Sequence, residues 1–173
     1  MGSLIRAGKV RAWGLCNDDA YGLTRAWAAA RAVGAPPPAV CQNDFSLLDR
    51  RVEENGLTGA MARSELNVGF LGYDALAGGF LADKYRAPRD TDSRAAAPPR
   101  GRHDTAEWGP YLARYRSEPA TRAAERYAAL ARGAGMPQAE LALRWARQRR
   151  GLTAALVGCS SLAQLEEVLR ERL

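Results

Sequence analysis

Residues 72–85, GYDALAGGFLADKY, decide the fold, and they follow the short apolar run VGFL at 68–71. An apolar run of this length is typical of a buried strand. The glycine pair Gly78 and Gly79 lets backbone amides approach another group closely, and the ammonium of Lys84 suits an anion such as phosphate. Glycine pairs are also common in plain turns, so the stretch alone fits either a phosphate-binding turn or a strand-to-loop turn with an exposed lysine.

Length and composition indicate one folded domain. The chain has 173 residues, of which 47% are hydrophobic, which is enough for a hydrophobic core. We therefore predict a single domain over residues 1–173. A run of about 18 apolar residues is absent, so a membrane span is not expected. The first ten residues, MGSLIRAGKV, lack the apolar stretch of a signal peptide.

The net charge of +6 does not by itself indicate nucleic-acid binding. The cations are nearly all arginines, and they alternate with Glu and Ala as on a solvated helix face, for example in RAAERYAALARGAG at 122–135. No basic cluster interleaved with aromatic residues supports a nucleic-acid partner. The three cysteines, Cys16, Cys41 and Cys159, match no zinc spacing, and their odd number argues against a disulfide framework. We therefore expect no metal site and a reducing, cytoplasmic compartment.

Hydrophobic periodicity predicts strands at 10–15, 39–42, 68–73 and 154–157, with helices at about 18–33, 58–64, 107–115, 118–133, 137–149 and 162–173. Asn17, Ser117 and the pair Ser160 and Ser161 are the predicted helix N-caps. Strands alternating with helices are typical of a parallel sheet with right-handed crossovers. Residues 86–105, rich in Pro, Arg and Asp, are predicted to form a long mobile loop. The only histidine, His103, lies in that loop and is predicted to be incidental to any chemistry.

Polar residues gather at one point of each strand-helix unit, at or just beyond the predicted carboxyl end of the strand. In α/β folds, ligands bind at this edge of the sheet. Because the same placement recurs at all four strands, it predicts a ligand site better than any single pair does. The residues are Cys16-Asn17, Gln42-Asn43, Tyr73-Asp74 and residues 158–161, GCSS.

Four sequence blocks resemble the second half of an aldo-keto reductase, in family order. GKVRAWGLCN resembles the fifth barrel strand, VCQNDFSLLDRR the sixth, GFLGYDALAGGFLADKY the seventh with its phosphate loop, and LVGCSSLAQLEEVL the eighth with its helix. The branch it is most similar to includes bacterial and plant reductases and the potassium-channel beta subunits. The resemblance implies a partial (β/α)8 TIM barrel: four parallel strands, five to eight of the family, with outer helices.

The resemblance also implies a cofactor, NADP, and the residues that hold it. Asn17 and Gln42 match amides that bind the nicotinamide carboxamide, and Tyr73 matches the aromatic residue against which nicotinamide lies. The pyrophosphate would run beside the 76–78 backbone with Lys84 as its cation, and the remaining matches lie on the adenosine side. The implied cofactor-binding residues are Asn17, Gln42, Tyr73, Leu76, Ala77, Gly78, Lys84, Arg102, Gly158, Ser160, Gln164 and Glu167.

Several positions depart from the family pattern. Asp74 replaces a serine and Ala75 a proline, Cys16 stands where serine or threonine is usual, Val168 replaces an asparagine, and Asp83 replaces a glycine. An aspartate beside a pyrophosphate would repel it unless it points away. We therefore expect weakened NADP binding.

No residue matches the family's catalytic tyrosine, lysine, aspartate and histidine, so no catalytic residue is assigned. Three interpretations stay open. The chain is a truncated NADP-dependent reductase that is inactive alone, a non-catalytic nucleotide-binding or interaction module, or a half that assembles with itself or with a complementary half-barrel. The carbonyl substrate, the preference between NADP and NAD, and the oligomeric state do not follow from the sequence.

Overall fold

The computed structural model describes residues 1–64, 66–82, 85 and 101–169. These residues form two compact units, each described here by itself. The first contains Met1–Phe45, Asp49–Tyr73 and Ala146–Leu156, and the second contains Ser46–Leu48, Asp74–Trp145 and the part that begins at Val157.

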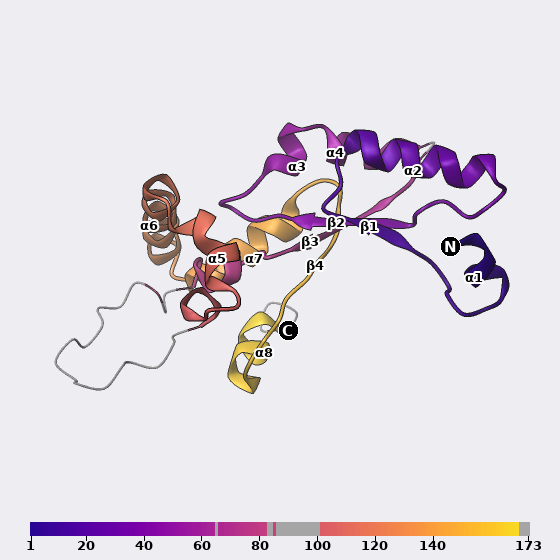
Figure 1. The fold of residues 1–173 in the computed structure, drawn as a ribbon. Helices are drawn as coiled ribbons and strands as arrows, with labels where there is room; N and C mark the ends of the chain where they lie inside the picture. The colour runs from indigo at the N-terminus through magenta and orange to yellow at the C-terminus, as the bar shows by residue number, and fades with distance from the viewer. Residues whose placement is uncertain (65, 83–84, 86–100, 170–173) are drawn as a thin grey trace. The chain divides into compact units, whose positions relative to one another are not determined.

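A four-stranded parallel sheet forms the centre of the first unit (Figure 1). Its strands are β1 (Gly14–Cys16), β2 (Val40–Asp44), β3 (Gly69–Tyr73) and β4 (Leu152–Ala155), and they pair in the order β1-β2-β3-β4. The predicted α/β class is thereby confirmed: four consecutive parallel strands with surrounding helices are the arrangement of a partial barrel. The bounds of all four strands differ from the prediction, most at β1, which begins at Gly14 rather than residue 10, and at β4, which begins at Leu152 rather than residue 154.

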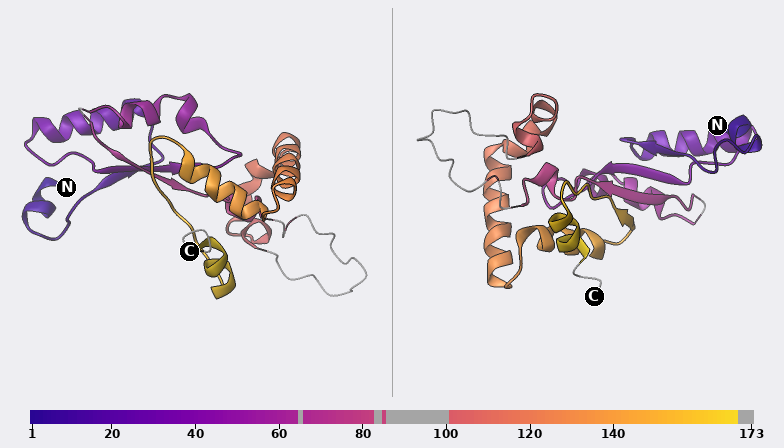
Figure 2. Two further views of the ribbon diagram at one scale, coloured as in Figure 1. Left: turned by 180° about the vertical axis from the view of Figure 1, so that it is seen from behind. Right: turned by 90° about the horizontal axis from the view of Figure 1, so that it is seen from below.

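Helices of the first unit cover one face of this sheet. In Figure 1 and in the reverse view of Figure 2, α2 runs along one side of the strands. On β3, and on β2 up to Asn43, the side chains alternate between buried and half-buried positions, as expected where one face packs on helices. The covering helices are α2 (Ala20–Ala32), α3 (Arg51–Glu54) and α4 (Leu57–Met61), whereas α1 (Gly2–Arg6) has no buried residue. The buried residues that pack on this side include Leu23, Ala30, Cys41, Leu57, Met61 and Phe70.

The start of α2 corrects one predicted cap. Asp19, not Asn17, is the N-cap: its backbone is extended, and its carboxylate accepts a hydrogen bond from the Gly22 amide at 2.8 Å. Asn17 instead has a φ of 58°, in the left-handed region. Asparagine tolerates this conformation better than most residues, and the chain uses it here to leave β1.

The second unit is mostly helical. It contains η1 (Ala77–Gly79), η3 (Arg102–Asp104), α5 (Gly109–Leu112), η4 (Ala113–Arg116), α6 (Glu118–Gly133), the first part of α7 (Gln138–Gln148), and α8 (Leu162–Leu169). The predicted cap Ser117 is confirmed, because its hydroxyl accepts from the Ala120 amide at 3.4 Å. Within the predicted loop at 86–105, residues 86–100 lie outside the described residues, and the structured remainder contains η3.

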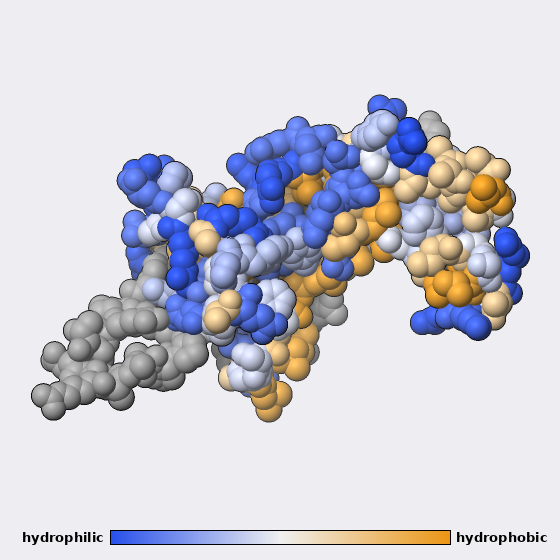
Figure 3. All heavy atoms as spheres, in the orientation of Figure 1, coloured by the Kyte–Doolittle hydropathy of each residue, from blue (hydrophilic) through white to orange (hydrophobic). Residues whose placement is uncertain are grey.

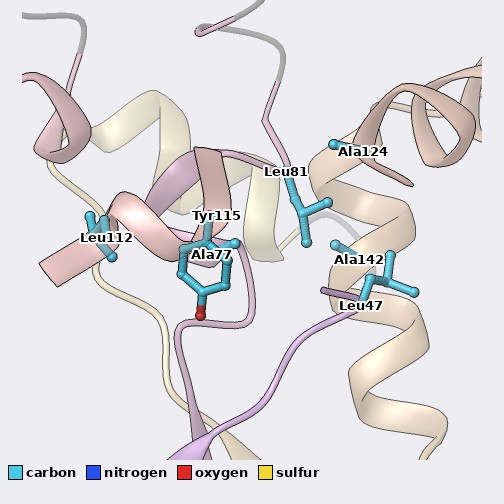
Figure 4. Packing of buried hydrophobic residues seen from close by; sticks show 7 residues of the cluster. All are labelled: Leu47, Ala77, Leu81, Leu112, Tyr115, Ala124 and Ala142. Carbon is cyan, nitrogen blue, oxygen red and sulfur yellow. The ribbon is translucent and has the colours of Figure 1, made fainter. Parts of the chain in front are cut away.

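A small hydrophobic core holds the second unit together, and it reaches the turn that follows β3 (Figure 4). Three alanines of α6, at i, i+4 and i+7, are buried, which lets neighbouring segments approach closely. Because Ala77 is fully buried in this core, the glycine-rich turn is anchored by packing. The core residues are Leu47, Ala77, Leu81, Leu112, Tyr115, Ala124 and Ala142. Among the described residues, no helix is both long and apolar enough to cross a membrane.

Candidate functional site

Three predicted site residues meet at the carboxyl ends of the first three strands. The Tyr73 hydroxyl donates to the Asn17 side-chain oxygen at 2.7 Å, and the backbone amide of Asn17 donates to the backbone carbonyl of Gln42 at 2.9 Å. The Cys16 thiol lies 4.0 Å from Gln42 Oε1, which it approaches as a weak donor. The strand register explains this grouping, since Cys16 pairs with Gln42 and Tyr73 ends the next strand. The result is a polar cluster made of two amides and one phenol.

The buried amide of this region is Asn43 rather than Gln42. Gln42 is half-buried, whereas Asn43 is only 9% exposed and its amide group donates to the Asp18 carbonyl at 3.0 Å. The Cys41 thiol donates to Asn43 Oδ1 at 3.2 Å, and burial raises the pKa of Cys41 to about 11, so this thiol stays neutral. Sequence reasoning singled out Gln42 and missed this role of Asn43. The alternation along VCQND could have found it, because Asn43 shares its face with the buried Cys41.

The turn after β3 is wound in the left-handed region at three consecutive residues. The φ angles are 49° at Ala77, 64° at Gly78 and 95° at Gly79. A Cβ atom at Gly78 would lie 2.6 Å from Leu112 Cδ1 and 3.0 Å from His103 Nε2. Both the backbone angle and the space therefore require glycine at position 78. The predicted phosphate-loop residues Leu76, Ala77 and Gly78 all lie in this tight turn.

Asp74 points into this turn, not away from it. Its side chain is 13% exposed, and its Oδ2 lies 3.7 Å from Arg114 Nη2. Burial raises the pKa of Asp74, while Arg114, then Arg102, then His103 and the Gly78 amide oppose that rise. The carboxylate therefore sits where its charge is partly compensated by cations of η3 and η4.

Arg114 is held between two aromatic rings. Its guanidinium carbon lies 4.4 Å from the ring centroids of both Tyr111 and Tyr115. Its amino groups also donate to the Tyr111 carbonyl at 2.6 Å and to the Tyr115 hydroxyl at 3.1 Å. Stacking and hydrogen bonding together fix this cation beside Asp74.

His103, predicted to be incidental, is buried against the turn. It is 2% exposed, and its Nε2 lies 2.8 Å from the Ala77 carbonyl oxygen. Arg116 Nε donates to His103 Nδ1 at 3.3 Å, so the hydrogen of a neutral ring is on Nε2 and is donated to Ala77. Burial lowers the pKa of His103, which favours this neutral form. The polar sequence around His103 gave no signal of this burial.

The remaining predicted residues lie at the start of α8 and on η3. A Cβ at Gly158 would lie 3.0 Å from Arg102 Nη2, and the Arg102 guanidinium is 5.7 Å from the Trp108 ring centroid. Both the amide and the hydroxyl of Ser160 donate to Gln164 Oε1, at 2.8 and 3.0 Å. The structure thus brings Arg102 to Gly158 and Ser160 to Gln164.

Three other predictions at this end have different outcomes. Ser161 accepts from the Gln164 amide at 3.3 Å, which confirms it as a capping side chain of α8. Glu167 is half-buried on α8. Lys84 lies outside the described residues. Within the described part of the chain, no group of three His, Cys, Asp or Glu side chains could hold a metal ion.

The chain is similar in sequence to known proteins. The sequence matches the Aldo/keto reductase family over residues 1–172. Similar curated proteins include an aldo-keto reductase of Babesia bovis, 32% identical over 168 residues (95% of this chain, 55% of that protein). Protein tas of Escherichia coli (strain K12) is 31% identical over 161 residues (93% and 43%). An aldo-keto reductase of Pseudocercospora fijiensis is 27% identical over 172 residues (96% and 55%).

The chain spans about half the length of these curated relatives, namely 43–55%. The family match, in contrast, covers nearly all of the chain. The chain therefore belongs to the aldo/keto reductase family, whose members are oxidoreductases that generally bind NAD(P)H.

Proposed function

We propose that this chain is the cofactor-binding half, equivalent to strands five to eight, of an NADP-dependent carbonyl reductase. The observation that carries this proposal is the polar cluster at the strand ends, in which Tyr73 donates to the Asn17 side chain and the Asn17 and Gln42 backbones are hydrogen-bonded to each other. Two amides beside an aromatic ring offer the donors, acceptors and flat surface that a nicotinamide carboxamide needs. Family membership supports the assignment independently.

Each part of the site would bind a different part of the cofactor. Asn17 and Gln42 would hold the carboxamide, and the Tyr73 ring would support the nicotinamide. Backbone amides of the 76–78 turn, with Lys84, would hold the pyrophosphate, because amides donate to phosphate oxygens without an intervening side chain. Residues at the start of α8 and on η3 would meet the adenosine end: Arg102, Gly158, Ser160, Gln164 and Glu167.

We further propose that the isolated chain does not reduce carbonyls. Hydride transfer to a carbonyl needs a proton donor whose pKa is tuned by neighbouring groups. Nothing in the sequence matches the family's tyrosine acid or its lysine, aspartate and histidine partners. The bound cofactor would supply the hydride, while the residues of this chain would only bind and orient it. We also propose a reducing, cytoplasmic compartment, which the three free thiols support.

NADPH fluorescence titration tests the proposal, run beside an aldehyde turnover assay. We expect weak saturable binding, weaker still in Lys84→Ala by about 1–3 kcal/mol because a charge-assisted contact is lost. Lys9→Ala removes a lysine outside the proposed site and is the matched control. Binding without turnover would fit both a reductase half and a non-catalytic nucleotide module. Robust turnover by the purified chain would overturn the proposed inactivity.

A second candidate function is assembly with a complementary half-barrel of the same family. Exposed apolar residues on and before α8 favour it: Val157 is 42% exposed, Leu162 70%, Leu165 41% and Leu169 44% (Figure 3). Apolar side chains gathered on one helix are typical of an interaction surface. The partner would carry the strands that match the first half of the longer relatives.

Coexpression with the first half of such a relative, followed by light scattering, tests this assembly. A one-to-one complex with carbonyl reductase activity is expected, and Leu165→Glu should disrupt it. Glu166→Lys, on the same helix, changes charge without touching the apolar residues and is the control. If the chain elutes at 18.7 kDa whether or not the partner is present, assembly is contradicted.

A further inference from the structure

We propose that the Asp74 carboxylate is a built-in occupant of the phosphate-binding turn, so that a nucleotide phosphate enters the turn only by displacing it. The inference rests on the proposed function, since it concerns the same turn. It identifies the residue that sets the affinity of this chain for phosphate-bearing ligands.

The Asp74 carboxylate lies beside a guanidinium group at the left-handed turn. Arg114 Nη2 is 3.7 Å from Asp74 Oδ2, and the side chain of Asp74 is 13% exposed. Burial raises the pKa of this carboxylate, whereas the charges of Arg114 and Arg102 and the Gly78 amide, in the middle of the turn, favour its ionised form and oppose that rise. Backbone amides of a left-handed turn with a guanidinium group beside them are typical of a phosphate site. In this chain a side-chain carboxylate lies beside that guanidinium group.

The carboxylate is held beside this turn by a fixed cation. The backbone of Asp74 is itself left-handed, with a φ of 56°. Arg114 cannot move away easily, because Tyr111 and Tyr115 stack on it and accept its hydrogen bonds. The contacts therefore come from the backbone on one side and from a fixed cation on the other.

A ligand phosphate would compete with the Asp74 carboxylate for this position. A carboxylate and a phosphate cannot share one set of donors without strong repulsion, because two like charges a few ångströms apart in a partly buried site disfavour each other. Removing the charge at position 74 removes this repulsion and leaves the charge of Arg114 to attract the ligand. Nucleotide affinity should therefore rise, whereas loss of an ordinary binding residue would lower it.

Two substitutions separate the charge of Asp74 from its shape. Asp74→Asn keeps the size and tolerates the left-handed backbone, and Asp74→Gly removes the side chain while tolerating the same angle. Glu118→Gln is the matched control, because it removes one negative charge from the same unit at an exposed helix position that pairs with Arg122. Thermal unfolding of every variant shows that each is folded.

Affinity is measured with two probes, NADPH by fluorescence and inorganic pyrophosphate by calorimetry. We expect both Asp74 variants to bind each probe at least about fivefold more tightly than wild type, because the carboxylate no longer repels the phosphate. Partial exposure to water keeps this gain modest. Glu118→Gln should stay within about twofold of wild type, as an exposed charge does.

The two probes distinguish failure of this inference from failure of the proposed function. If both Asp74 variants bind pyrophosphate more tightly but no protein binds NADPH, the inference is supported and the proposed function is contradicted. NADPH binding by wild type that is equal or weaker in Asp74→Asn and Asp74→Gly would overturn the inference and leave the proposed function standing. An equal gain in Glu118→Gln would also overturn it, since net charge alone would explain the result.

Discussion

The Tyr73 hydroxyl donates to Asn17 Oδ1 across 2.7 Å, which joins the carboxyl ends of β3 and β1 past the intervening strand β2. This bond is exposed at the Asn17 end, so water can replace it at small cost. The Tyr73 ring and the Asn17 amide are the groups that we propose to contact the nicotinamide. The hydrogen bond between them would therefore orient these two groups more than it stabilises the fold.

Substitution at Tyr73 should separate the ring from the hydroxyl. We expect Tyr73→Phe to lower the free energy of unfolding by less than about 1 kcal/mol and to change NADPH affinity by less than about threefold, because the ring is kept. Tyr73→Ala should weaken NADPH binding by about tenfold, since the stacking surface is lost. Denaturant unfolding and fluorescence titration measure the two quantities. Equal affinities for the Phe and Ala variants would contradict the stacking role.

Gly78→Ala should strongly destabilise the second unit. A left-handed angle at alanine costs about 1–2 kcal/mol. The added Cβ would also lie 2.6 Å from Leu112 Cδ1 in a packed core, where overpacking costs about 1–3 kcal/mol. Gly59→Ala in α4 is the control: its Cβ meets nothing within 4 Å, so we expect no loss of stability. Urea unfolding of both variants measures the difference, and similar midpoints would contradict the strain assigned to position 78.

Protonation of His103 should make stability depend on pH. Burial lowers the pKa of this histidine below its usual value of 6.5, so the unfolded chain binds the proton more readily than the folded chain. The resulting stability is fully present above pH 6.5 and is lost as pH falls through the folded-state pKa. Because the chain has one histidine, His103→Gln should remove this component from the pH profile. A wild-type stability that rises on acidification relative to His103→Gln would show the opposite sign.

Features set by neighbouring residues were predicted better than features set by contacts between residues far apart in the chain. The predicted cap Ser117 is confirmed because a cap depends on local geometry, and here a glutamate and a proline follow the serine directly in the first turn of the helix. Asn17 failed as a cap because Asp19, two residues later, competes for the same helix start. The parallel sheet followed from alternation of strands and helices, whereas the strand ends shifted by up to four residues.

The surroundings of Asp74 and His103 could not be predicted in the same way. Repulsion of a phosphate by Asp74 was expected from its charge, but the contact with Arg114 joins residues far apart in the chain. Burial of His103 depends on the Ala77 carbonyl and on aromatic neighbours, chiefly Tyr85 and Phe80. Nothing in a polar segment such as GRHDT indicates that its central residue packs inward. These contacts arise from tertiary packing, which overrides local composition.

Adjacent amides on β2 should show opposite effects, because strand alternation sends them to opposite faces. Asn43 is buried and donates to the Asp18 carbonyl just before α2, so Asn43→Ala leaves that carbonyl without its donor. We expect a loss of about 1–3 kcal/mol in the free energy of unfolding, with intrinsic cofactor affinity changed little in the folded fraction. Gln42→Ala, at a half-buried position, should cost less than about 1 kcal/mol but weaken NADPH binding several-fold through loss of a carboxamide contact. Unfolding curves and titrations at a temperature where both variants are folded compare the pair. If Gln42→Ala loses more stability than Asn43→Ala, or if Asn43→Ala loses more affinity, the division between a structural and a cofactor-binding amide is wrong.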